Sequence, residues 1–199
     1  VATDQMEDSP TNNFATMNPL DNTMTSTFKE GNLEVYTGAT PATGRTDATF
    51  GVTTGKWYWE YLLTLVSTNG YIGIGESGDG GAIGDSANDY VFRFNGNKRH
   101  NGSESSYGSA DLVDGNIVGI ALDLDSATTT LTIYDDGSTM GTMYSSLNSG
   151  VTYLPNIGDI HSLSNQKGIF NFGQDSSFAG NKTAQGNQDG NSIGDFYYE

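Results

Sequence analysis

Residues 57–66, with the sequence WYWEYLLTLV, are a run of aromatic and aliphatic side chains that contains a single acid, Glu60. The segment YIGIG at residues 71–75 follows after a Thr-Asn-Gly sequence at residues 68–70. Two apolar runs joined by an Asn-Gly turn predict an antiparallel β-hairpin. We therefore expect the fold to be built around this aromatic strand.

Side chains alternate between the two faces of a strand, so Trp57, Trp59 and Tyr61 share one face. Aromatic side chains on a central strand usually supply buried area, and we expect this face to fill the interior. The alternative is a platform on which sugars stack, and that function requires exposed tryptophan rings.

Other short segments with strand character recur along the middle of the chain, separated by Gly, Asn and Asp. They occupy residues 32–36, 90–94, 116–124, 129–134, 140–144, 151–157 and 168–173. Helical spacing of apolar residues is nearly absent. Short strands at regular intervals predict an all-β protein, an antiparallel two-sheet β-sandwich.

The two ends of the chain lack this pattern. Residues 1–30 are rich in Thr, Asn, Asp and Met and contain Pro10 and Pro19, which interrupt strands. We expect an extended N-terminal arm over residues 1–30 and the sandwich over residues 31–178. Residues 179–199 are rich in Gly, Asn and Asp, and we expect a C-terminal arm that continues in a longer polypeptide.

The composition excludes several classes of partner. Acidic residues outnumber basic ones by 24 to 8, for a formal net charge of −16. The one basic cluster, Lys98-Arg99-His100, is too small for a nucleic-acid interface. No segment is apolar over the length of a membrane span, so we expect no membrane insertion. The chain has no Cys, which excludes disulfides and thiolate zinc sites.

From residue 55 onward the sequence resembles SPRY domains. The segment GKWYWE at residues 55–60 is similar to the opening of the SPRY core. Further segments follow in the order of the family, namely YIGIG at 71–75, YG at 107–108, DGNIVGIALDLD at 114–125, LTIYDDG at 131–137, MG at 140–141, YLP at 153–155 and FNFGQ at 170–174. The resemblance covers about residues 48–178 and implies a concanavalin A-like jelly roll of the SPRY type.

The flanking segments, residues 8–20 and 187–198, resemble those of SPRY-bearing proteins of marine bacteriophages. In such proteins the module sits inside long tail, fibre or surface polypeptides. The resemblance therefore implies a location in a virion, or outside the cell or on its surface. It implies no particular ligand.

Glu60 is the one acid in an apolar strand, and an ionised carboxylate among apolar neighbours needs a partner. We expect a structural partner, which is Lys56, Arg93 or a backbone amide. The alternative is the acid catalyst of a glycosidase, which needs a second carboxylate at a set distance. No paired-acid strand motif and no Gly-x-Ser-x-Gly turn occurs, so we expect no enzyme activity.

Two segments share the pattern Asp-Gly-x-x-Ile-Gly-Asp, at residues 79–85 and 189–195. Oxygen-rich loops that contain glycine can wrap a calcium ion. The candidate calcium ligands are Asp79, Asp85, Asp189, Asn191 and Asp195. Ordinary glycine turns are the alternative, because the full spacing of a calcium loop is absent. No other cofactor is expected.

Loops at the ends of a sandwich carry binding on a rigid frame. Residues 93–102 concentrate the positive charge of the central region, and arginine and aromatic side chains commonly anchor recognition surfaces. The candidate ligand-binding residues are Arg93, Asn95, Lys98, His100, Tyr107, Asp85 and Asp89. The alternative for Arg93 is an internal ion pair with Glu60 or Asp89.

Together these observations predict a non-enzymatic virion module in a tail fibre, an appendage or a capsid decoration. Its expected partners are other virion or surface proteins, further copies of the same chain, or a protein or glycan of the host surface. The alternative is a secreted or cell-surface glycan-binding lectin of a marine bacterium. A jelly-roll glycosidase is the third candidate.

Overall fold

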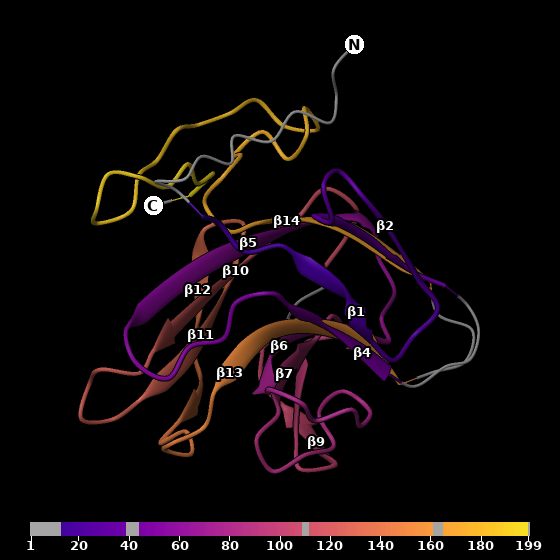
Figure 1. Cartoon of the computed structure of the whole chain (residues 1–199), viewed down its shortest axis with the longest axis vertical. Helices are drawn as coiled ribbons and strands as arrows, with labels where there is room; N and C mark the ends of the chain where they lie inside the picture. Colours follow the sequence, from indigo (N-terminus) through magenta and orange to yellow (C-terminus); the bar gives the residue numbers. More distant parts are fainter. Residues whose placement is uncertain (1–12, 39–43, 109–111, 161–164, 199) are drawn as a thin grey trace.

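Two seven-stranded antiparallel sheets face each other across an apolar core (Figure 1). The structure is a computed structural model, and it describes residues 13–38, 44–108, 112–160 and 165–198. The first sheet has the order β1 (Met17–Asn22), β4 (Gly44–Ala48), β13 (Tyr153–Asp159), β6 (Gly70–Glu76), β7 (Tyr90–Arg93), β8 (Asn97–His100) and β9 (Ser103–Ser106). The second sheet has the order β12 (Ser138–Ser145), β11 (Thr130–Asp135), β10 (Ile117–Asp123), β5 (Lys56–Leu65), β14 (Gln166–Asn171), β3 (Glu34–Thr37) and β2 (Ser26–Lys29).

This architecture confirms the predicted all-β sandwich, and each predicted strand range contains or overlaps a strand. In the part of the chain that the structure describes, no helix is long and apolar enough to cross a membrane. Strands β5 and β10 form the centre of the second sheet and pair without a bulge from Ile117 opposite Leu62 to Asp123 opposite Lys56. The long aromatic run is therefore the central strand that the sequence indicates.

The predicted aromatic face of β5 is buried at two of its three positions. Trp59 and Tyr61 lie in the core, where the Tyr61 ring packs 4.6 Å from that of Phe170 and stacks 6.3 Å from that of Phe94 of the first sheet. The prediction is wrong for Trp57, whose side chain is 40% exposed. Trp57 is the second residue of β5, and the first two residues of this strand are exposed whereas its middle is buried.

The prediction of an extended N-terminal arm is wrong for residues 17–29, because β1 and β2 are strands of the two sheets. Strand β1 pairs only with β4 and therefore lies at a sheet edge, where the missing N–H of Pro19 breaks no ladder. The register of this pairing shifts between Met17 and Asn22. The first twelve residues of the predicted arm lie outside the described residues.

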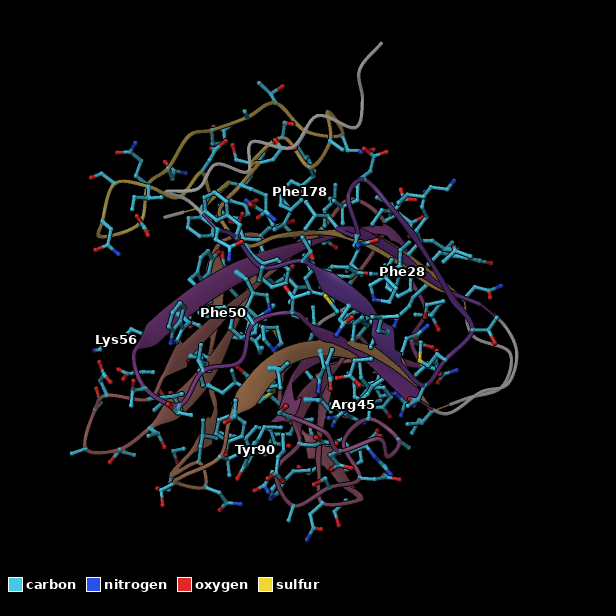
Figure 2. The ribbon with its side chains drawn as sticks, viewed as in Figure 1. Phe28, Arg45, Phe50, Lys56, Tyr90 and Phe178 are labelled. Carbon is cyan, nitrogen blue, oxygen red and sulfur yellow. The ribbon has the colours of Figure 1, made fainter. Side chains whose placement is uncertain are left out.

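The C-terminal segment, which follows β14, lies across the outer face of the second sheet, above β5 and β14 (Figure 1). Phe178 and Phe196 are buried there, and Figure 2 shows Phe178 between this segment and the sheet. The segment is irregular, as predicted from its composition, but its two ends are packed against the sheet. Consequently β5 is covered on both faces, which explains why its run of apolar residues is continuous.

The anchor of this segment is Glu60, which is fully buried. Its two carboxylate oxygens accept hydrogen bonds from the backbone N–H of Tyr197 at 2.9 Å and of Tyr198 at 2.8 Å. Asn171 Nδ2 and the Tyr58 hydroxyl donate to the same carboxylate at 3.1 and 3.2 Å. Of the partners expected for Glu60, the structure shows the backbone amide. Burial raises the pKa of Glu60, although these donors act in the opposite direction.

We predict that Glu60→Gln lowers the free energy of unfolding by about 1–3 kcal/mol, because an amide nitrogen then faces backbone donors that need an acceptor. Urea denaturation followed by tryptophan fluorescence measures this change. Glu34→Gln is the matched control, since the Glu34 carboxylate pairs with the ammonium group of the partly exposed Lys167. Equal effects of the two substitutions would contradict the role given to Glu60.

Candidate binding surface

An exposed pair of aromatic rings lies at one end of the sandwich. Phe50, from the loop before β5, and Trp57 have ring centroids 5.6 Å apart and are 45% and 40% exposed (Figure 2 labels Phe50). Trp57 Nε1 donates to the Thr54 carbonyl at 2.7 Å, which fixes the indole ring. The large exposed apolar side chains among the described residues are Leu20, Phe50, Trp57, Leu65, Val113 and Ile193. Phe50 and Trp57 are the two aromatic residues of that set, and their rings are in contact.

Polar contacts hold the backbone around this aromatic pair. Asp125 Oδ1 accepts a hydrogen bond from Gly55 N at 2.7 Å, and Lys56 Nζ lies 2.9 Å from Asp123 Oδ2. Asp123 also accepts from the backbone N–H groups of Asp125 and Ser126, so it shapes the turn between β10 and β11. Hydrogen bonds from Lys56 and Ser126 lower the pKa of Asp123. The loop before β5 and this turn thus form one polar rim beside the rings.

Three of the predicted ligand-binding residues lie on β8 or just after β9, and each contacts a residue of β12. Lys98 Nζ lies 4.6 Å from the ring centroid of Tyr144 and 5.8 Å from that of Tyr107. The His100 ring stacks 4.4 Å from the ring of Tyr90. The Tyr107 hydroxyl donates to the Gly141 carbonyl. These side chains are half-buried, so they link the two sheets and remain partly accessible to solvent.

The other predicted residues lie elsewhere. Arg93 pairs with Glu104 at 2.7 Å, so the partners expected for its internal ion pair, Glu60 and Asp89, are wrong. Asp85 pairs with Arg99. Asn95 is exposed and accepts a hydrogen bond from the next residue but one. The structure therefore divides the predicted set among several places instead of one site.

Asp89 is fully buried and is not available to a ligand at the surface, which corrects its place in the predicted set. Its carboxylate lies 2.8 Å from Arg45, a 2% exposed arginine that also contacts Asp47 at 2.9 Å and the Glu76 carbonyl (Figure 2). Gly84 N donates to the other Asp89 oxygen at 3.0 Å. This network holds the loop between β6 and β7 against the first sheet. No motif in the sequence marks Arg45, because it lies in a polar segment.

The candidate calcium ligands are occupied by local contacts. Asp79 Oδ1 accepts from a backbone N–H two residues on, and Asp189 Oδ1 accepts from three, those of Asn191, Ile193 and Gly194. Asp195 Oδ2 accepts from Ser176 N. Within the described ranges, no three acidic or histidine side chains gather around a common point. This geometry fits the turn interpretation, and calcium binding stays a prediction.

The structure is thus an antiparallel sandwich with two aromatic side chains exposed beside its loops. A family model of the SPRY domain matches residues 56–175, which is more than half of the chain. The chain belongs to the SPRY domain family. SPRY domains are protein-interaction modules and are typically non-catalytic.

Solved structures share this fold at low sequence identity. The SPRY domain of human HERC1 is 16% identical with a TM-score of 0.66, over 77% of this chain and 96% of that domain. The structure of stonustoxin is 16% identical with a TM-score of 0.60, over 79% of this chain and 27% of that chain. No curated protein matches the sequence.

The sequence pattern predicts that Trp57 lies in the core, and it does not single out Phe50. One signal was available for Trp57, which follows the Gly-Lys sequence that begins the strand and so lies at the strand end. Phe50 has no comparable signal. It belongs to a loop whose path is set by the distant Asp125 contact.

We predict that stability falls by on the order of 2 kcal/mol between pH 5 and pH 8. Burial raises the pKa of Asp47 from 3.8 to about 7, despite the nearby Arg45. The folded chain therefore holds this proton more tightly than the unfolded chain. The resulting stabilisation is complete below about pH 4 and is lost as the pH rises through about 7.

Urea denaturation at a series of pH values measures this dependence. Asp47→Asn removes the titrating group while it keeps the shape of the side chain, and its stability should change much less between pH 5 and pH 8. An equally steep loss in this variant would show that Asp47 is not the source.

Proposed function

We propose that this chain is a non-catalytic binding module that engages a protein partner through the end of the sandwich that carries Phe50 and Trp57. The observation that carries the proposal is the contact between these two exposed rings. Tryptophan is enriched among the few residues that supply most of the affinity of protein interfaces. An anchor fixed by a hydrogen bond to the Thr54 carbonyl also loses little side-chain freedom on binding.

The electrostatics favour a basic partner. The net charge of −16 speeds association with positively charged surfaces and suppresses contact with acidic ones. Asp123 and Asp125 lie in the rim beside Trp57, so this charge is also present near the anchor. The absence of a catalytic role is supported by Glu60, because the acid of the central strand is buried beneath the C-terminal segment.

The setting that we propose is a virion, as part of a tail fibre, an appendage or a capsid decoration, or the outside of a cell. It rests on the likeness of the flanking segments to SPRY-bearing proteins of marine bacteriophages. The partners would be neighbouring virion or surface proteins, or a protein of the host surface. Binding of phage particles to host cells in the presence of the purified chain tests this setting.

Glycan binding is the second candidate function, and the exposure of Trp57 favours it. Sugars stack on exposed aromatic faces, and carboxylates such as that of Asp123 accept hydrogen bonds from hydroxyl groups. A glycan array with and without calcium tests this candidate. Selective binding that Trp57→Ala abolishes would support a lectin.

We predict that Trp57→Ala weakens binding to the protein partner by at least about 30-fold, which corresponds to the 2 kcal/mol typical of an anchor residue. The affinity is measured by biolayer interferometry against the purified host-surface or virion protein that the wild-type chain binds. Leu20→Ala is the matched control, because Leu20 is 96% exposed and lies on β1. Equal loss from both substitutions, or none from Trp57→Ala, would contradict the proposed anchor.

A further inference from the structure

Residues 187–198 form a small closed unit, here called the C-terminal strap. The backbone groups of Asn187 and Phe196 exchange two hydrogen bonds, at 3.0 and 2.7 Å, and Asn187 Nδ2 donates to the Tyr197 carbonyl. Between them Asp189 closes a turn through three backbone N–H groups. These hydrogen bonds lie within the strap, so they do not depend on its position relative to the sheet.

The strap lies in a site on the second sheet, here called the seat, formed by Tyr58, Glu60, Gly137 and Asn171. Glu60 accepts the two backbone N–H groups described above, and Asn171 Nδ2 donates to the Asp195 carbonyl at 2.8 Å. The Phe196 ring packs 5.2 Å from that of Tyr58. A Cβ at Gly137 would lie 2.6 Å from the ring of Tyr198. The seat thus contacts both the backbone and the aromatic rings of residues 196–198.

The connection between the strap and the sandwich is exposed. Residues 183–186 are all exposed, and their backbone contacts to the body are those of Gln185 and Gly186 with Ser176 Oγ, at 3.1 and 3.3 Å. Before this hinge, Phe178 is buried against the second sheet and Lys182 Nζ donates to the Gly115 carbonyl. The hinge therefore joins the strap to a turn that has its own contacts with the sheet, and the strap touches this turn through the Tyr197 ring, 6.3 Å from that of Phe178.

We propose that the seat also accepts the C-terminal strap of a second copy of this chain, so that neighbouring copies exchange straps. None of the contacts in the seat requires the strap to belong to the same chain. Exchange of an identical element through an exposed hinge gives a dimer in which the contacts of the seat are the same as in the monomer. This surface is separate from the Phe50–Trp57 pair, so the inference does not depend on the proposed function.

Exchange depends on the local concentration of chains. A tethered strap experiences an effective concentration on the order of 1 mM, so isolated copies in dilute solution stay closed. Copies held side by side in an assembly reach comparable concentrations, and exchanged straps then link them. The proposal thus supplies a physical route to contact between copies of the same chain, which is one of the kinds of partner expected from the sequence.

Two full-length variants that complement each other test this proposal. Phe196→Ala/Tyr198→Ala has an intact seat and a defective strap, and Glu60→Gln has an intact strap and a defective seat. Each is examined alone and in a 1:1 mixture by sedimentation velocity, after circular dichroism confirms the fold. We expect the mixture to contain at least about tenfold more dimer than either variant alone, because a strap and a seat meet only in the mixture.

Gly137→Ala is a second seat variant for the case that Glu60→Gln does not fold, since it blocks the position of the Tyr198 ring from an exposed turn. A mixture that stays as monomeric as its components would overturn the proposal. Dimers formed equally well by the strap-defective variant alone would overturn it too, because the contact would then not involve the strap.

Discussion

The arrangement of the chain depends on one buried carboxylate. Glu60 lies on the central strand, and four hydrogen-bond donors surround its carboxylate, whereas no ion pair joins it to a described Lys or Arg. Two of the donors belong to the backbone of the C-terminal segment. Because an unpaired buried charge is costly, the sheet and this segment each require the other. This contact covers the second face of β5 and leaves its exposed end, at Trp57, as the place where an apolar anchor reaches solvent.

The sequence is enough to predict the sandwich and its apolar strands, because the alternation of apolar and polar residues and the turn residues are local signals. The strands that this pattern does not mark are polar ones. Strand β4, with the sequence GRTDA, is buried along its whole length because Arg45 forms ion pairs with Asp47 and Asp89. Asp89 is more than forty residues away from Arg45 in the chain. Such a strand depends on tertiary contacts that no window of sequence contains.

The same dependence on tertiary contacts explains which parts of the candidate site the sequence predicts and which it does not. Lys98 and His100 lie two residues apart on β8, and Lys98 Nζ is 5.8 Å from the ring centroid of Tyr107, which follows β9 of the same hairpin. The Phe50–Trp57 pair was not predictable, because exposure depends on where the opposing sheet ends. For the same reason, the sequence gives Glu60 three possible partners, and only the folded chain selects the backbone of residues 197 and 198.

Hydrogen exchange at the amides of Tyr197 and Tyr198 tests this account most directly. Both N–H groups donate to a carboxylate that is fully buried, so they should exchange much more slowly than the same amides in an unfolded peptide. Exchange of these two amides as fast as in an unfolded peptide would contradict the account, because it would leave Glu60 without its partners in the folded protein.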